Sequence, residues 1–129
     1  SLNNIKINEA IKIILNNKDF KCFTKSKTDV TNYLCNIIDS KWIEFDKKYV
    51  FEITANRFLR NMVRSIVGTL IDVGLEKKSI NNFKKIIMSK DRSMAGYSVP
   101  AKGLFLKRIN YPKEIFIWKK VIQAVKYLI

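Results

Sequence analysis

The hydrophobic positions at the beginning of the chain repeat with helical spacing. They share one face of a helical projection: Ile7, Ala10, Ile11, Ile14 and Leu15. The polar pair Asn16 and Asn17 then interrupts the pattern, so we predict a helix over about residues 8–16. The polar segment 24–32 that follows is predicted to be a loop.

The next apolar positions alternate, as they do in strands. We predict a first strand over about residues 33–45 and a second over 49–55, where every second residue is apolar or aromatic. The sequence DKK at 46–48 is predicted to form the turn of an antiparallel hairpin. A last strand is predicted at LFLKRINY, residues 104–111, before Pro112.

Helical spacing returns after the hairpin. A wide apolar stripe predicts a helix over about residues 57–73, with Gly74 as its stop. Ser79 is predicted to cap a further helix, INNFKKIIMSK. The tail KEIFIWKKVIQAVKYLI, residues 113–129, also has apolar residues on one side and is predicted to be helical. These elements predict an α+β fold, a small and mostly antiparallel sheet covered by helices.

The charge adds a candidate partner. The 129 residues carry a formal net charge of +14, which favours a nucleic acid or an anionic membrane as the partner. A compositional bias toward Lys, Ile and Asn remains an alternative explanation. The chain has no histidine, which excludes the Ser-His-Asp and Cys-His hydrolase mechanisms.

The two cysteines, Cys22 and Cys35, form no CxxC pair. A disulfide framework and a zinc site are therefore poor interpretations, and we expect buried or idle thiols in a reducing compartment. The sequence has no apolar run of the length that a membrane span needs, and its N-terminus lacks the apolar region of a secretory signal.

Three arginines stand close together in a chain that otherwise prefers lysine. Arg57, Arg60 and Arg64 are spaced i, i+3 and i+7, which would place them on one flank of the predicted helix. Arginine grips a carboxylate or a phosphate at two points, which lysine cannot do. An acidic partner, either a carboxylate or an RNA phosphate, would explain the cluster; a solvated basic face is the alternative.

The segment KDRSMAGYSVPAKGLFL is a second candidate site. It carries Asp91 and Arg92 and leads into an apolar wall at Leu104. Its loop position, charge and glycines suit a contact with RNA. The alternative is an ordinary surface loop, in which Asp91 acts as a cap or a local ion-pair partner.

Two of these segments resemble one known family. FEITANRFLRNMVRSIVGTLIDVG and DRSMAGYSVPAKGLFLKRINYP resemble the C-terminal half of the bacterial tRNA pseudouridine synthase A family. KDFKCFTK is similar to the family's HDFxxFxx, with Lys18 where histidine is common. The resemblance covers about residues 8–112. Residues 113–129 depart from it and would form a C-terminal helical extension beside a domain at 1–112.

The resemblance implies an activity and partners. The family isomerises uridine to pseudouridine in the anticodon stem-loop of tRNA, at positions 38 to 40, with no cofactor and no metal. An aspartate in the N-terminal half attacks the nucleoside, the C–N glycosidic bond breaks, and the uracil is rejoined through C5. Such enzymes are typically cytoplasmic homodimers that bind tRNA in a basic cleft between their two halves.

The resemblance also assigns residues. Arg64 matches the arginine of the family's MVR, which pairs with the catalytic aspartate, and Leu104 matches the apolar residue that packs against the flipped base. Arg57, Arg60 and Arg92 are candidates for RNA backbone contacts or for support of the site.

One departure limits the expected activity. The family's aspartate lies in an RTDAGVHA-like segment that this sequence lacks, and Asp19, Asp72 and Asp91 are poor substitutes for it. We therefore expect the 129-residue chain to be inactive without an N-terminal half. Two other interpretations stay open: a non-catalytic RNA-binding module, and a protein that docks through its tail.

Overall fold

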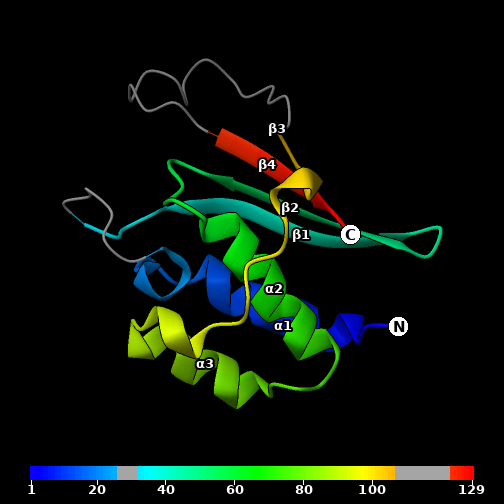
Figure 1. The fold of residues 1–129 in the computed structure, drawn as a ribbon, viewed down its shortest axis with the longest axis horizontal. Helices are drawn as coiled ribbons and strands as arrows, with labels where there is room; N and C mark the ends of the chain where they lie inside the picture. Colours follow the sequence, from blue (N-terminus) through cyan, green and yellow to red (C-terminus); the bar gives the residue numbers. More distant parts are fainter. Residues whose placement is uncertain (26–31, 107–122) are drawn as a thin grey trace.

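The computed structural model describes residues 1–25, 32–106 and 123–129, which form three helices and a four-stranded sheet (Figure 1). The helices are α1 (Asn4–Leu15), α2 (Met62–Gly74) and α3 (Ile80–Ser89), and the strands are β1 (Ile37–Phe45), β2 (Lys48–Ala55), β3 (Leu104–Leu106) and β4 (Gln123–Leu128). The strand order is β1-β2-β4-β3, and each neighbouring pair is antiparallel. The predicted α+β fold with an antiparallel sheet is confirmed. None of the described helices has the length and hydropathy that crossing a membrane requires.

The core lies between one face of the sheet and the helices. Trp42, Phe51 and Tyr127 are aligned across β1, β2 and β4 by the strand register, and all three are buried. They belong to one buried cluster with the apolar stripes of the helices, such as Ile7 on α1 and Ile66 on α2. Burial of this apolar surface is the main force that holds the helices on the sheet.

The helix boundaries differ from prediction in two places. The first helix begins at Asn4 rather than near residue 8, because the side chain of Asn3 accepts a hydrogen bond from the backbone N–H of Lys6 at 3.2 Å and caps the helix there. The helix predicted from residue 57 begins only at Met62. Asn61 has φ of 66°, a left-handed conformation that does not continue a right-handed helix. The predicted cap at Ser79 is confirmed, and Asn82 completes a capping box with it.

The strands also differ from prediction at their ends. The first strand begins at Ile37 rather than Tyr33, and the hairpin turn consists of Asp46 and Lys47, both with positive φ. The part of the predicted last strand that lies beyond residue 106 is outside the described residues.

The predicted helix at 113–129 is wrong for residues 123–128, which form β4 between β2 and β3. Val125 and Tyr127 face the core, whereas Lys126 and Leu128 lie on the opposite face, so the period is two. Val125 and Ile129, spaced i and i+4, also fit a helical stripe, but the backbone bonds offered by β2 and β3 favour the strand. Residues 113–122 lie outside the described residues.

The two thiols are buried and free, as expected from the sequence. Burial raises the pKa of Cys22 to about 12 and also raises that of Cys35. We expect the folded protein to react with neither cysteine in a disulfide-exchange assay at pH 8, because the thiolate is the nucleophile. The protein unfolded in denaturant should show two reactive thiols. Fast reaction of the folded protein would contradict the buried positions.

Candidate functional site

A cavity of about 390 Å³ lies where the beginning of α2 faces β3 and β4. Its lining combines apolar side chains with three cationic ones: Lys25, Phe58, Leu59, Arg60, Asn61, Met62, Val63, Arg64, Ala101, Leu104 and Val125. The cations come from the segment after the 3-10 helix η1 (Lys21–Phe23), from the turn before α2, and from the first turn of α2. The cavity therefore has an apolar wall beside positive charge.

Arg64 is the most firmly held of these cations. Its Nε donates a hydrogen bond to the carbonyl of Val99 at 2.7 Å, and the N–H of Val99 donates to the carbonyl of Arg64 at 3.1 Å. The guanidinium is thus fixed through its Nε atom. Within the described residues its two terminal nitrogens form no hydrogen bond, so they can bind an acidic group at two points.

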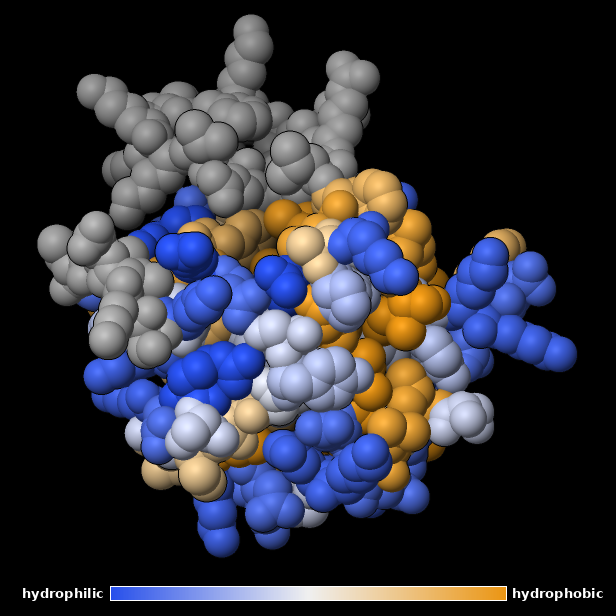
Figure 2. Space-filling model, in the orientation of Figure 1, coloured by the Kyte–Doolittle hydropathy of each residue, from blue (hydrophilic) through white to orange (hydrophobic). Residues whose placement is uncertain are grey.

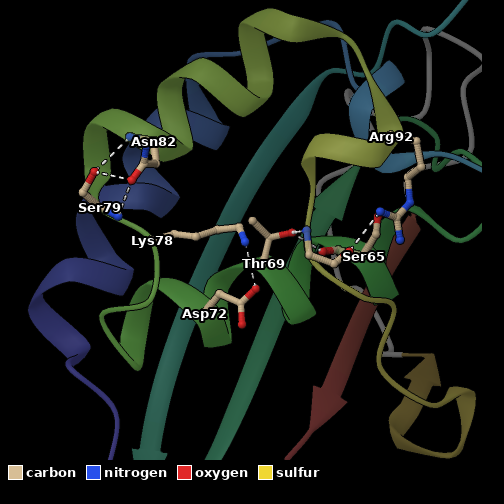
Figure 3. A network of polar contacts seen from close by, with 8 residues as sticks. Ser65, Thr69, Asp72, Lys78, Ser79, Asn82 and Arg92 are labelled. Atoms are coloured by element: carbon tan, nitrogen blue, oxygen red, sulfur yellow. Dashed lines mark hydrogen bonds and ion pairs between the residues drawn. The ribbon is translucent and has the colours of Figure 1, made fainter.

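Val99 belongs to the crossing loop, residues 95–100, which passes over α2. The N–H of Gly96 donates to Thr69 Oγ1 at 2.9 Å, and that hydroxyl donates to the carbonyl of Ser65 at 2.8 Å. Figure 3 shows Ser65 and Thr69 on α2 beneath this loop. The loop and the helix are therefore joined at two points, Thr69 and Arg64, one on each side of Gly68.

Arg92, which precedes the crossing loop in the chain, holds the loop by two side-chain hydrogen bonds. Its Nη1 donates to the carbonyl of Gly96 at 2.9 Å and its Nη2 to Ser98 Oγ at 3.0 Å (Figure 3 shows the side chain). Asn61, from the turn before α2, donates to the same Ser98 hydroxyl through Nδ2. Arg92 therefore supports the loop that orients Arg64, and it does not line the cavity.

The structure brings together three of the five predicted site residues. Arg60, Arg64 and Leu104 line the cavity. Arg57 lies elsewhere: its Nη1 donates to Asn32 Oδ1 at 3.0 Å and to the carbonyl of Leu34 at 3.3 Å. The prediction that Arg57, Arg60 and Arg64 share one helical flank is wrong, because the first two precede α2.

The other lining residues were not predicted from the sequence to belong to a site, and three of them show why. The turn at Asn61 could have been predicted, since asparagine tolerates the left-handed conformation that this residue adopts directly before α2. Lys25 stood in a segment predicted only as a loop. Val125 was assigned to a helical tail, and nothing in the sequence placed that tail beside Leu104.

The acidic residues named as poor substitutes for a nucleophile lie outside the cavity lining. Asp72 pairs with Lys78 at 3.3 Å (Figure 3), and Asp19 pairs with Lys90 at 3.5 Å. Asp91 caps the 3-10 helix η2 (Arg92–Met94) by accepting from the N–H and the hydroxyl of Ser93, which lowers its pKa. Of the two roles expected for Asp91, a cap or a local ion-pair partner, the structure shows the cap.

The arrangement can bind an anion next to a flat apolar group. The lining contains no carboxylate, and the chain has no histidine, so these residues supply no general acid or base that titrates near neutral pH. Burial raises the pKa of Tyr127, which stays protonated and donates to the carbonyl of Pro100 at 2.7 Å. The described residues hold no group of three or more potential metal ligands among Asp, Glu, Cys and His.

The chain is similar to proteins whose names state an activity. A family model described as "tRNA pseudouridine synthase" matches residues 10–112. A tRNA pseudouridine synthase A of Bacteroides fragilis is 47% identical over 112 residues, covering 86% of this chain and 44% of the relative. The protein of the same name from Porphyromonas gingivalis is 47% identical over 114 residues, covering 87% and 45%.

A third relative gives the same result. The tRNA pseudouridine synthase A of Clostridium acetobutylicum is 45% identical over 103 residues, covering 80% of this chain and 42% of the relative. The chain thus spans less than half the length of these curated relatives. The model match includes both the arginine turn before α2 and the crossing loop, and on these grounds the chain belongs to the tRNA pseudouridine synthase family.

Proposed function

We propose that the complete protein converts uridine to pseudouridine in the anticodon stem-loop of tRNA, and that this chain supplies one wall of the active site. The observation that carries the proposal is the geometry of Arg64. Its guanidinium is fixed at Nε by Val99, its terminal nitrogens form no hydrogen bond within the described residues, and the residue lines a cavity together with Leu104. This is the arrangement needed to hold a carboxylate beside a nucleobase.

The chemistry requires an aspartate from a segment outside this sequence. That carboxylate attacks the nucleoside, the C–N glycosidic bond breaks, the uracil turns, and a C–C bond forms through C5 as the bond to the carboxylate breaks. C5 then loses its proton and N1 gains one. In this scheme Arg64 forms a bidentate ion pair with the aspartate, which lowers the pKa of the carboxyl and fixes its direction. Leu104 packs against the flipped base. Arg60, at the exposed edge of the cavity, contacts the RNA backbone.

Partners and compartment follow from the same proposal. A net charge of +14 suits tRNA, and two buried free thiols suit the reducing cytoplasm. The sheet face opposite the helices exposes Ile43, Phe45 and Leu128, an apolar surface that suits contact with an N-terminal half or with a second copy in a homodimer.

The alternative is a non-catalytic RNA-binding module. The observation that favours it is a cavity with cations and apolar side chains but no acidic lining residue. A pure binding module has no need for an arginine that is fixed at Nε and keeps its terminal nitrogens unbonded in the cavity lining, so the position of Arg64 favours the enzyme.

Reconstitution separates the two functions. We expect the 129-residue chain alone to form no pseudouridine, and a chimera in which it replaces the matching residues of the Bacteroides fragilis relative to be active. The measurement is tritium release from tRNA that contains uridine labelled at C5, because that hydrogen leaves when C5 bonds to the ribose. A chimera that is folded and binds tRNA but releases no tritium would favour the binding module. Activity of the chain alone would contradict the assigned need for a second segment.

A further inference from the structure

A second groove, of about 290 Å³, lies beside the cavity on the side of η1 and η2. Four cationic side chains line it, and they come from separate parts of the chain: Lys21, Lys25, Lys90 and Arg92. Lys90 follows α3 in a left-handed conformation, with φ of 54°, which places it at the groove rather than on the helix. The side of the molecule where η1 lies is coloured mostly as hydrophilic in Figure 2.

The acidic groups nearby leave this groove positive. Asp91 accepts hydrogen bonds from the N–H and the hydroxyl of Ser93, at 2.9 and 2.8 Å, so its carboxylate is directed into its own turn. Asp19 pairs with Lys90 at 3.5 Å and accepts from the N–H of Lys21 at 2.9 Å. Two carboxylates against four cations leave a local charge of about +2 at neutral pH. The groove therefore attracts anions.

An aromatic ring is placed among these charges. Lys21 Nζ lies 5.4 Å from the centre of the Tyr33 ring, and Tyr33 also lines the groove. Aromatic rings interleaved with lysine and arginine are typical of surfaces that bind single-stranded nucleic acid, because bases stack on the ring while phosphates contact the cations. The Tyr33 ring is half-buried, so part of it is accessible to a base.

The groove and the cavity share a wall. Lys25 lines both. Its N–H donates to the carbonyl of Arg60 at 3.3 Å, and Thr24 Oγ1 donates to the same carbonyl at 3.0 Å. These bonds fix the segment that carries Lys25 against the arginine turn before α2. The two hollows therefore adjoin at Lys25, with Arg60 in the lining of one and Lys21 and Lys90 in the lining of the other.

We propose that this groove binds the RNA backbone next to the nucleotide held in the cavity, through phosphate contacts to Lys21, Lys25 and Lys90. The inference rests on the proposed function for the identity of the nucleic acid. Arg92 takes a different part: its two terminal nitrogens hold Gly96 and Ser98, so it supports the crossing loop. The groove extends the RNA contact beyond the flipped nucleotide and fixes the direction in which the strand leaves the cavity.

The test compares two triple variants of equal charge. Lys21→Gln/Lys25→Gln/Lys90→Gln removes the groove lysines, and Lys48→Gln/Lys77→Gln/Lys85→Gln removes three exposed lysines outside it; each lowers the formal net charge from +14 to +11. Binding of an anticodon stem-loop RNA to the 129-residue chain is measured from 50 to 300 mM salt. Circular dichroism establishes that all three proteins are equally folded.

We expect the groove variant to bind about tenfold more weakly at 100 mM salt and its slope of log K against log salt to be shallower by about 2, since each phosphate contact contributes about 0.7 for a single strand. The control variant should change the slope by less than about 0.5. Equal slopes and affinities for the two variants would overturn the inference. So would capture of poly-glutamate with the same lysine dependence but no lysine-dependent binding of RNA, which would identify an acidic protein as the occupant.

The result separates this inference from the proposed function. If the groove variant loses RNA affinity while Arg64→Lys leaves turnover of the chimera intact, the groove binds RNA as inferred and the catalytic role assigned to Arg64 is wrong. If the groove variant binds RNA normally while Arg64→Lys abolishes turnover, the catalytic role assigned to Arg64 is correct and the RNA-binding role of the groove is wrong.

Discussion

Under the proposed function, replacing Arg64 by lysine should lower turnover of the chimera on the order of 100-fold while changing tRNA affinity by less than about threefold. Lysine keeps the charge but has no fork, and it cannot donate the bond that Nε makes to Val99 at 2.7 Å. The aspartate of the proposed ion pair would then be held at one point rather than two, and a misplacement of about 1 Å is enough to cost a factor of this size. Steady-state and single-turnover tritium release from the chimera, with tRNA binding measured in parallel, gives both quantities.

The control for this variant is Arg60→Lys. Arg60 lines the same cavity, but it is exposed and its side chain forms no hydrogen bond within the described residues. Its replacement by lysine keeps a phosphate contact that depends mainly on charge, so turnover should fall by less than about threefold. An equal loss of turnover and binding in Arg64→Lys would contradict the ion pair with the aspartate, because a residue that only binds RNA affects both.

The fold was largely predictable where one periodicity dominated. The stripe of α2 and the alternation of β2 have only one interpretation each, and both elements are present. The error at the beginning of α2 has a local cause. Leu59 fits the helical stripe, but the left-handed conformation of Asn61 prevents the helix from beginning before Met62. Apolar spacing reports the buried face and contains no information about a single residue that reverses φ.

The helix prediction for residues 113–129 failed for a different reason, as its described part shows. Val125 fits the helical spacing with Ile129 and also the strand alternation with Tyr127, and the choice depends on neighbours distant in sequence. Tyr127 pairs with Phe51 in β2 and with Leu104 in β3. Strand propensity is set largely by such packing, so the segment by itself did not determine its structure.

Sequence reasoning located part of the candidate site. Residue type singled out Arg64, because arginine persists there in a lysine-rich chain, and the family motif singled out Leu104. Neither signal predicted that Arg92 acts through the crossing loop. Its hydrogen bonds to Gly96 and Ser98 can be predicted only when the path of the loop in space is known. Lys25 enters the cavity only because its segment is bonded to the carbonyl of Arg60.

The crossing loop explains why α2 contains a glycine. Gly68 lies between the two residues that bind the loop, Arg64 and Thr69, and the loop passes directly over it. A Cβ atom at this position would lie 1.7 Å from the carbonyl oxygen of Tyr97 and 2.9 Å from its carbonyl carbon. Both are backbone atoms, so no side-chain rotation can relieve the overlap. The close approach brings Val99 to the distance at which it holds Arg64.

Gly68→Ala should therefore destabilise the protein and misplace Arg64. Alanine favours a helix interior over glycine by about 1 kcal/mol, which opposes the effect. Over-packing of a buried site costs about 1–3 kcal/mol or more, and here the obstacle is backbone. We expect a net loss of about 2 kcal/mol in the free energy of unfolding, measured by urea denaturation of the chain. In the chimera, turnover should fall on the order of tenfold or more, because a displaced loop no longer fixes the Nε atom of Arg64.

Gly74→Ala is the matched control in the same helix. Its new Cβ would approach Ile7 Cδ1 at 2.6 Å, the far end of a flexible side chain that can turn away. We expect a smaller change in stability and no change in turnover, since Gly74 lies at the end of α2 away from Arg64. If Gly68→Ala were as stable and as active as the unsubstituted protein, the loop would not depend on this close approach. A loss of stability with full turnover would show that Arg64 keeps its direction without the crossing loop, and the positioning role assigned to Val99 would then be wrong.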